Sequence, residues 1–125
     1  MKTLFKTLTI LLLSTFIFTG CGTAPIYNAT NKIDSPKSAS ATYRAIKSAG
    51  TSLGWKINKI RPGVAQGKLY LRKHIAVIKI RYSARSYKIN YVKSTNLKYD
   101  AAKQVIHTNY NGWIQNLEKE INIRL

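Results

Sequence analysis

The chain has 125 residues, with 21 lysines and arginines, 4 aspartates and glutamates, 2 histidines and a single cysteine. This length suits one small domain, and a single cysteine excludes a disulfide within the chain. So few carboxylates and histidines leave little material for an acid–base pair or for a metal centre, which needs several ligands. The excess of positive charge predicts attraction to anionic partners, although solvated surface lysines of purely compositional origin would give the same excess.

The first 20 residues have the pattern of a secretory signal peptide. Lys2 and Lys6 precede an apolar run over 8–18, and small residues follow it. The run is shorter than the about 20 residues that a membrane-spanning helix needs. An ordinary signal peptide and an uncleaved anchor remain alternatives.

The tetrapeptide Phe18-Thr19-Gly20-Cys21 resembles the lipobox of bacterial lipoproteins. The resemblance implies that the chain is cut before Cys21, whose thiol and new amine are acylated with palmitate-like chains. Multiple acyl chains attach a protein stably to a membrane. Without the leader and its two lysines, 19 basic residues face 4 acidic ones, a net charge of +15.

Three regions are expected along the chain: a signal peptide over 1–20, a lipidated cysteine with a flexible tether over 21–37, and a single domain over 38–125. The tether holds two of the three prolines and few apolar side chains.

The domain is predicted to be α+β. Ser38 suits the N-cap of a helix over 38–49. Alternating apolar residues and short turns predict antiparallel strands over 55–60, 64–71, 74–82 and 86–93. A second helix follows, capped by Asp100 or beginning nearer Asn109. The order is α-β-β-β-β-α, a four-stranded antiparallel sheet with two helices packed on one face.

Strict alternation divides the strand residues between two faces of the sheet. The buried face should carry Trp55, Ile57, Leu69, Leu71, Ala76, Ile78, Ile80, Tyr82, Tyr87, Ile89 and Tyr91. The open face should carry six cations with Tyr70 as the sole aromatic, namely Lys56, Lys68, Arg72, Lys79, Arg81 and Lys88. Nucleic-acid modules usually interleave stacking aromatics with the charge, so anionic lipid or lipopolysaccharide fits this face better than nucleic acid.

A second candidate site lies between the last strand and the last helix. Aromatic and polar residues gather there and could line a pocket, namely Tyr91, Ser94, Tyr99, His107, Tyr110 and Trp113. The alternative is that their hydroxyls and amides satisfy buried backbone groups where the loop enters the helix.

Catalytic chemistry is not expected. The carboxylates of Asp34, Asp100, Glu118 and Glu120 form no pair at a spacing suited to acid–base work, and no Gly-x-Ser-x-Gly turn exposes a serine. No catalytic residue, metal site or cofactor is predicted. His74, at a strand start, is expected to pack or cap.

The chain contains the segments Tyr-x-x-Ser-x-Asn-Leu-x-Tyr over 91–99 and Ile-His-x-x-Tyr-Asn-x-Trp over 106–113. The chain resembles a family of small, functionally uncharacterised proteobacterial lipoproteins, and the resemblance is strongest in these two segments. The similarity covers most of residues 40–123. It implies an envelope location and a single α+β domain, and it brings no activity, ligand or catalytic residue.

The sequence therefore predicts a non-enzymatic lipoprotein of the cell outer membrane that faces the periplasm and acts as a binding or assembly module. Gly22, rather than Asp, follows the cysteine, and by resemblance to enterobacterial sorting this disfavours the inner membrane. Expected partners are the membrane through the lipid, and anionic lipid, lipopolysaccharide or an envelope protein. The alternatives are a surface-exposed lipoprotein that binds glycans or a host, and a small hydrolase of envelope polymers that uses His107.

Overall fold

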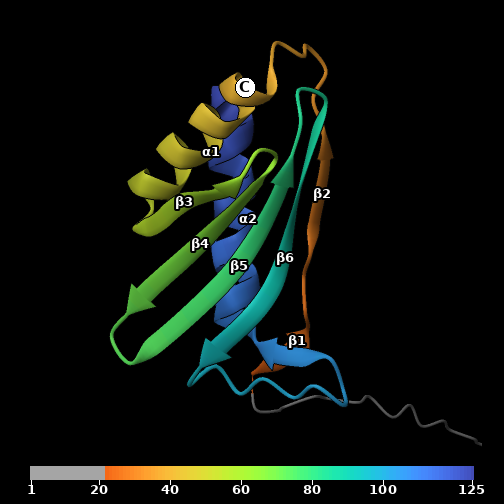
Figure 1. Cartoon of the computed structure of the whole chain (residues 1–125). Coiled ribbons are helices and arrows are strands. Elements are labelled where there is room, and N and C mark those ends of the chain that lie inside the picture. Colours follow the sequence, from red (N-terminus) through yellow and green to blue (C-terminus); the bar gives the residue numbers. More distant parts are fainter. Residues whose placement is uncertain (1–21) are drawn as a thin grey trace, which may run out of the picture.

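The computed structural model describes residues 22–125, so the predicted signal peptide and Cys21 lie outside the described residues. The described chain holds two helices and two antiparallel sheets (Figure 1). In chain order the elements are β1 (Thr23–Pro25), β2 (Ala29–Lys32), α1 (Ala39–Ser52), β3 (Trp55–Arg61), β4 (Val64–Leu71), β5 (His74–Tyr82), β6 (Ser86–Thr95), β7 (Val105–His107) and α2 (Thr108–Arg124). The predicted α+β class is confirmed.

The larger sheet has five strands in the order β2-β6-β5-β4-β3. Its four strands β3 to β6 form the predicted meander, since short turns join each to the next and every pairing is antiparallel. α1 begins as predicted: Ser38 is the N-cap, and its hydroxyl oxygen accepts a hydrogen bond of 3.0 Å from the amide of Ala41.

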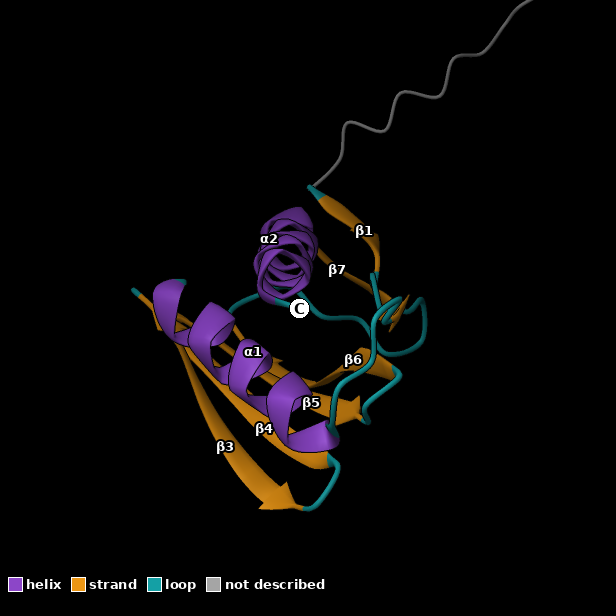
Figure 2. Ribbon diagram, turned by 90° about the horizontal axis from the view of Figure 1, so that it is seen from above, coloured by secondary structure: helices purple, strands orange, loops and turns teal. Residues whose placement is uncertain are grey.

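Both helices cover the same face of the five-stranded sheet, with α1 across the strands and α2 beyond it, next to β1 and β7 (Figure 2). Apolar side chains from both helices and from the inner face of the sheet form one core; its fully buried members include Ile46, Ile78, Ile80, Tyr87, Ile89, Tyr110, Ile114, Leu117 and Ile121. The opposite face of the sheet is left open.

The prediction of a flexible tether over 21–37 was wrong for the part that the structure describes. β1 pairs with β7 in a small second sheet, and β2 extends the large sheet along β6. Ala29 is 1% exposed opposite Ile89, so β2 contributes to the core. Short strands rich in polar residues resemble a linker in sequence, but here each finds an edge to pair with.

The carboxylate of Glu118 holds the N-terminal segment against α2. The hydroxyl of Tyr27 donates to one of its oxygens at 2.6 Å, and the side-chain amide of Asn31 donates to the other. Hydrogen bonds to a charged acceptor are stronger than neutral ones. The hydrogen bond from Tyr27 to Glu118 raises the pKa of Tyr27, and burial adds to the shift.

Two further predictions need correction. Asp100 does not cap the last helix: its carboxylate accepts from the amide of Lys103, and its backbone bridges Val105. α2 begins at Thr108, and the N-cap is His107, whose Nδ1 accepts from the amide of Asn109. Leu71 is 42% exposed rather than buried, because β4 ends there at the turn into β5.

Candidate functional site

The open face of the five-stranded sheet is a charged surface that the fold builds from several elements. Alternation places five of the six predicted cations on it, one or two from each of four strands: Lys56, Lys68, Lys79, Arg81 and Lys88. Lys56, Arg81 and Lys88 are exposed, and Lys68 and Lys79 are half-buried. The ammonium of Lys56 lies 5.7 Å from the ring centre of Tyr70 on the same face.

Two pairs of cations face each other across neighbouring strands. Lys56 of β3 lies opposite Lys68 of β4, and Arg81 of β5 lies opposite Lys88 of β6. Like charges in directly opposite positions destabilise a sheet. The open face therefore carries an electrostatic cost that a bound anion would relieve.

No carboxylate offsets these cations on the strands. Asp34 lies in the loop between β2 and α1, Asp100 lies in the loop before β7, and Glu118 and Glu120 lie on α2, beyond the covered face. The ion pair found among residues 22–125 joins Glu120 to Arg124 within α2 at 2.7 Å. Bound anions therefore meet no acidic competitor on the strands of the open face.

The structure changes the membership of this face at two positions. Arg72 lies in the turn between β4 and β5 with φ +58°, outside the strand ladder. Lys93 was missed: it pairs with Val77, so it shares the open face with Lys79. A bulge at Val92 shifts the register of β6, whereas strict alternation puts Lys93 on the buried side. A bulge leaves no clear signal in this stretch of sequence.

Four of the six residues predicted to line a pocket come together, and they pack against one another. The rings of Tyr91 and Tyr99 stack at 4.5 Å, and Tyr110 meets Tyr91 edge-on at 5.6 Å. The hydroxyls of Tyr91 and Ser94 share a hydrogen bond of 2.8 Å. Burial raises the pKa of Tyr91, although the Ser94 bond acts in the opposite direction. The cluster joins β6, the following loop and α2, which favours the structural alternative.

The other two residues, His107 and Trp113, lie outside this cluster. His107 caps α2, as described above. Trp113 lies 6.2 Å from the ring of His74, whose Nδ1 is 2.8 Å from the backbone oxygen of Asn96. Trp113 also lines an apolar hollow of about 200 Å³ with Leu53, Trp55, Leu69, Leu71 and Asn116.

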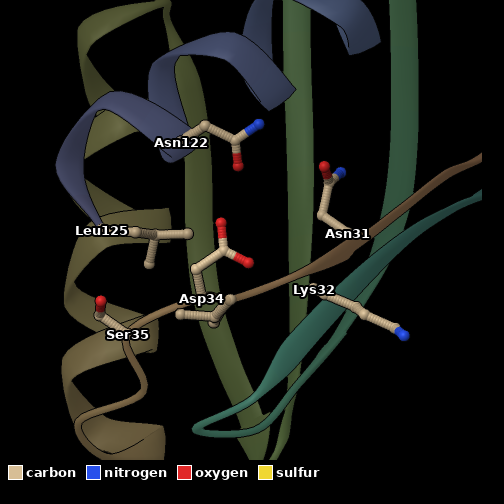
Figure 3. A pocket seen from close by; sticks show the side chains of 7 residues that line it. Asn31, Lys32, Asp34, Ser35, Asn122 and Leu125 are labelled. Atoms are coloured by element: carbon tan, nitrogen blue, oxygen red, sulfur yellow. The ribbon is translucent and has the colours of Figure 1, made fainter.

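A more polar hollow of about 420 Å³ lies where the loop after β2 passes the end of α2 (Figure 3). The side chains of Asn31, Asp34 and Asn122 point toward a common space, and Lys32 points away from it. The carbonyl oxygen of the Asn122 side chain already accepts from the hydroxyl of Tyr87 at 2.7 Å. This hollow thus shares its polar groups with the packing of α2 on the sheet.

Among residues 22–125, no group of three or more histidine, cysteine, aspartate or glutamate side chains is placed to hold a metal ion. None of the helices in this range is long and apolar enough to span a membrane. Comparison with protein families, with curated proteins and with solved structures finds no match. The resemblance to small proteobacterial lipoproteins therefore stays a prediction from the sequence.

Proposed function

We propose that the chain is a non-enzymatic envelope lipoprotein, anchored through Cys21 to the outer membrane on its periplasmic side, whose open sheet face binds phosphate-bearing envelope lipids. The lipobox-like tetrapeptide supports the anchor. The observation that carries the binding surface is the open face itself, with two like-charged cross-strand pairs and no carboxylate on its strands.

The charge arrangement favours a phosphate-rich ligand. Each lysine or arginine near an anionic surface contributes about 1 kcal/mol of attraction, and several on one flat face act together. The half-buried Lys68 and Lys79 are held by the sheet, so less side-chain freedom is lost when they bind. Anionic phospholipid and lipopolysaccharide both offer phosphate groups.

Binding can be measured with residues 22–125 and vesicles that contain phosphatidylglycerol, with lipopolysaccharide in a parallel series and phosphatidylcholine as the neutral control. Affinity should fall steeply as salt rises, because salt screens the attraction between the cations of the open face and the phosphates. Stronger binding to lipopolysaccharide than to phosphatidylglycerol would identify the source of the phosphate. Binding that is independent of salt contradicts the proposal.

A charge-matched pair of variants locates the surface. The triple variant Lys68→Glu, Lys79→Glu, Arg81→Glu should lose most of its affinity. The control triple Lys37→Glu, Arg44→Glu, Lys119→Glu makes the same change in net charge away from the open face, at exposed positions. The control should retain most of the affinity. Equal losses in both variants would show that net charge alone attracts the protein.

The anchor is tested separately in cells. Wild-type protein should incorporate labelled palmitate and sediment with outer membranes, whereas Cys21→Ser should do neither. Digestion of whole cells with protease should leave the protein intact if it faces the periplasm. Degradation by the protease would favour the surface-exposed alternative instead.

A further inference from the structure

The chain enters the described domain at one end of the molecule, and hydrogen bonds unite three segments there. The side-chain amide of Asn96 donates to the backbone oxygen of Lys73, the amide of His107 donates to the oxygen of Leu97, and the amide of Thr108 donates to the oxygen of Gly22, each at 2.8 Å. The turn over 71–74, the loop over 96–104 and Gly22 thus form one end (Figure 1). We call it the anchor end.

Exposed apolar and basic side chains are combined at the anchor end. Four of the eight large hydrophobic residues exposed in the described chain lie at or close to it: Tyr70 (54%), Val92 (44%), Leu71 (42%) and Tyr99 (40%). Five cations accompany them against the single carboxylate of Asp100: Arg72, Lys73, Lys93, Lys98 and Lys103. Aromatic and aliphatic groups beside lysine and arginine are the composition that membrane interfaces favour.

The backbone at the anchor end contains several residues in the left-handed conformation. All four residues other than glycine with positive φ in the described chain lie there: Arg72, Asn96, Lys98 and Gln104. A left-handed conformation costs roughly 1–2 kcal/mol for a residue with a Cβ, less for asparagine. Such conformations cluster where a structure serves a function rather than its own stability.

The opposite end carries two of the four carboxylates. Asp34 lies in the loop there, and Glu120 lies in the last turns of α2, whose C-terminus is at that end (Figure 1). Exposed apolar side chains and cations also occur at the opposite end, for example Ile123 (65%) and Arg85, so the anchor end is distinguished by its connection to residue 22. Its combination of apolar and basic side chains suits an anionic bilayer.

From this placement we infer that the domain stands on the anionic bilayer through its anchor end; the inference rests on the proposed acylation of Cys21. Because β1 pairs with β7 and Gly22 is bonded to Thr108, no flexible tether lies between Cys21 and the folded domain. The bilayer then meets the turn over 71–74 and the loop over 96–104. β4 and β5 then stand upright on the membrane, and the open basic face is presented sideways, where it binds a single phosphate-bearing lipid molecule instead of lying flat on the bilayer.

The test uses the full acylated chain in vesicles of phosphatidylglycerol and phosphatidylethanolamine. Single cysteines carry a nitroxide at Leu71→Cys or Val92→Cys of the anchor end, at Lys79→Cys of the open face, or at Ile60→Cys, which is 54% exposed beside the far turn. Access of a water-soluble nickel complex should be several-fold lower at the first two positions, and access of oxygen should be higher. The other two positions should keep the nickel access that they show without vesicles.

Distinct results separate failure of this inference from failure of the proposed anchor. A wild-type chain that takes up nitroxide has a free Cys21 thiol, and then the acylation itself is refuted. An anchored chain with equal nickel access at all four positions overturns the docking alone. Protection at Lys79→Cys but not at Leu71→Cys would instead show the open face lying on the bilayer.

Charge reversal provides a second readout that does not depend on one labelled site. Lys73→Glu with Lys93→Glu should restore nickel access at Val92→Cys in anionic vesicles. Lys37→Glu with Arg85→Glu makes the same change in net charge at exposed positions of the opposite end, and it should leave the protection intact. Restoration by both pairs, or by neither, overturns the inferred orientation.

Discussion

Two buried tyrosines of this core differ in one respect that decides their energetic roles. Tyr87 and Tyr110 are both fully buried. The hydroxyl of Tyr87 donates to the side chain of Asn122 at 2.7 Å and lies 3.3 Å from the backbone oxygen of Glu118. The hydroxyl of Tyr110 has no hydrogen-bond partner within residues 22–125. A buried hydroxyl without a partner costs about 1–3 kcal/mol.

Removing each hydroxyl should therefore have opposite effects. We expect Tyr110→Phe to raise the free energy of unfolding by about 1 kcal/mol at neutral pH, because it deletes an unsatisfied polar group. Tyr87→Phe should lower it by about 1 kcal/mol, because it leaves Asn122 without its donor. Urea unfolding of residues 22–125 measures both. A loss of stability in Tyr110→Phe would mean that an ordered water satisfies that hydroxyl.

The same residues predict a dependence of stability on alkaline pH. Burial raises the pKa of both Tyr87 and Tyr110, whereas in the unfolded chain each hydroxyl loses its proton at a pH of about 10. Above this pH the native state binds more protons than the unfolded state, so the free energy of unfolding falls as the pH rises. Below this pH the contribution of the two tyrosines to stability is fully present. The stability gain of Tyr110→Phe over wild type should thus grow between about pH 9 and pH 11. A stability gain that does not change with pH would contradict the raised pKa of Tyr110.

At the scale of elements, two helical glycines test how closely each helix packs. A methyl group added to Gly50 in α1 would come 2.5 Å from Cγ1 of Ile57, whereas one added to Gly112 in α2 would meet nothing within 4 Å. Alanine favours a helix over glycine by about 1 kcal/mol, and overpacking costs about 1–3 kcal/mol. Gly112→Ala should stabilise and Gly50→Ala should destabilise, as measured by thermal unfolding. Stabilisation by both would show that Ile57 moves aside freely.

The N-terminal strands should be required for stability. A chain over 38–125 lacks β1 and β2, so Ile89 loses its cover from Ala29 and Glu118 loses both side-chain donors. Each hydrogen bond to a charged acceptor contributes about 1.5–3 kcal/mol, so the truncated chain should be less stable than 22–125 by on the order of 3 kcal/mol or more. Denaturant unfolding compares the two. Equal stability would restore the view of this segment as a tether.

These strands also show where sequence reasoning reached its limit. β3 to β6 were predictable because each hairpin is local, with turn residues such as Pro62 and Gly63 between alternating strands. β1 was not, because Thr23 pairs with His107, far away in the chain, and neither three-residue strand has a periodicity to detect. The open cationic face followed from alternation, except at the bulge that moves Lys93. Which tyrosines meet around Tyr91 depends on how α2 packs, and that needs the three-dimensional structure.

At the scale of the whole molecule, positive charge dominates the energetics. The mature chain would carry 19 cations against 4 carboxylates, and such an excess destabilises a compact state through self-repulsion. The repulsion is concentrated on the open face, where Arg81 opposes Lys88 and Lys56 opposes Lys68. A surface that serves binding commonly lowers stability in this way.

Stability and binding should therefore change in opposite directions when this face is altered. Lys88→Glu and Lys68→Glu each convert a repulsive cross-strand pair into an attractive one, and each should stabilise residues 22–125 by about 0.2–1 kcal/mol. The gain should shrink as salt rises from about 0.01 M to about 0.15 M, because the Debye length falls from about 30 Å to about 8 Å. Both variants should bind phosphatidylglycerol vesicles more weakly than wild type. As a control, Lys119→Glu on α2 changes the net charge equally, away from the sheet. It should gain less stability and keep its affinity, so matching values for all three variants would leave the cross-strand pairs without a special role.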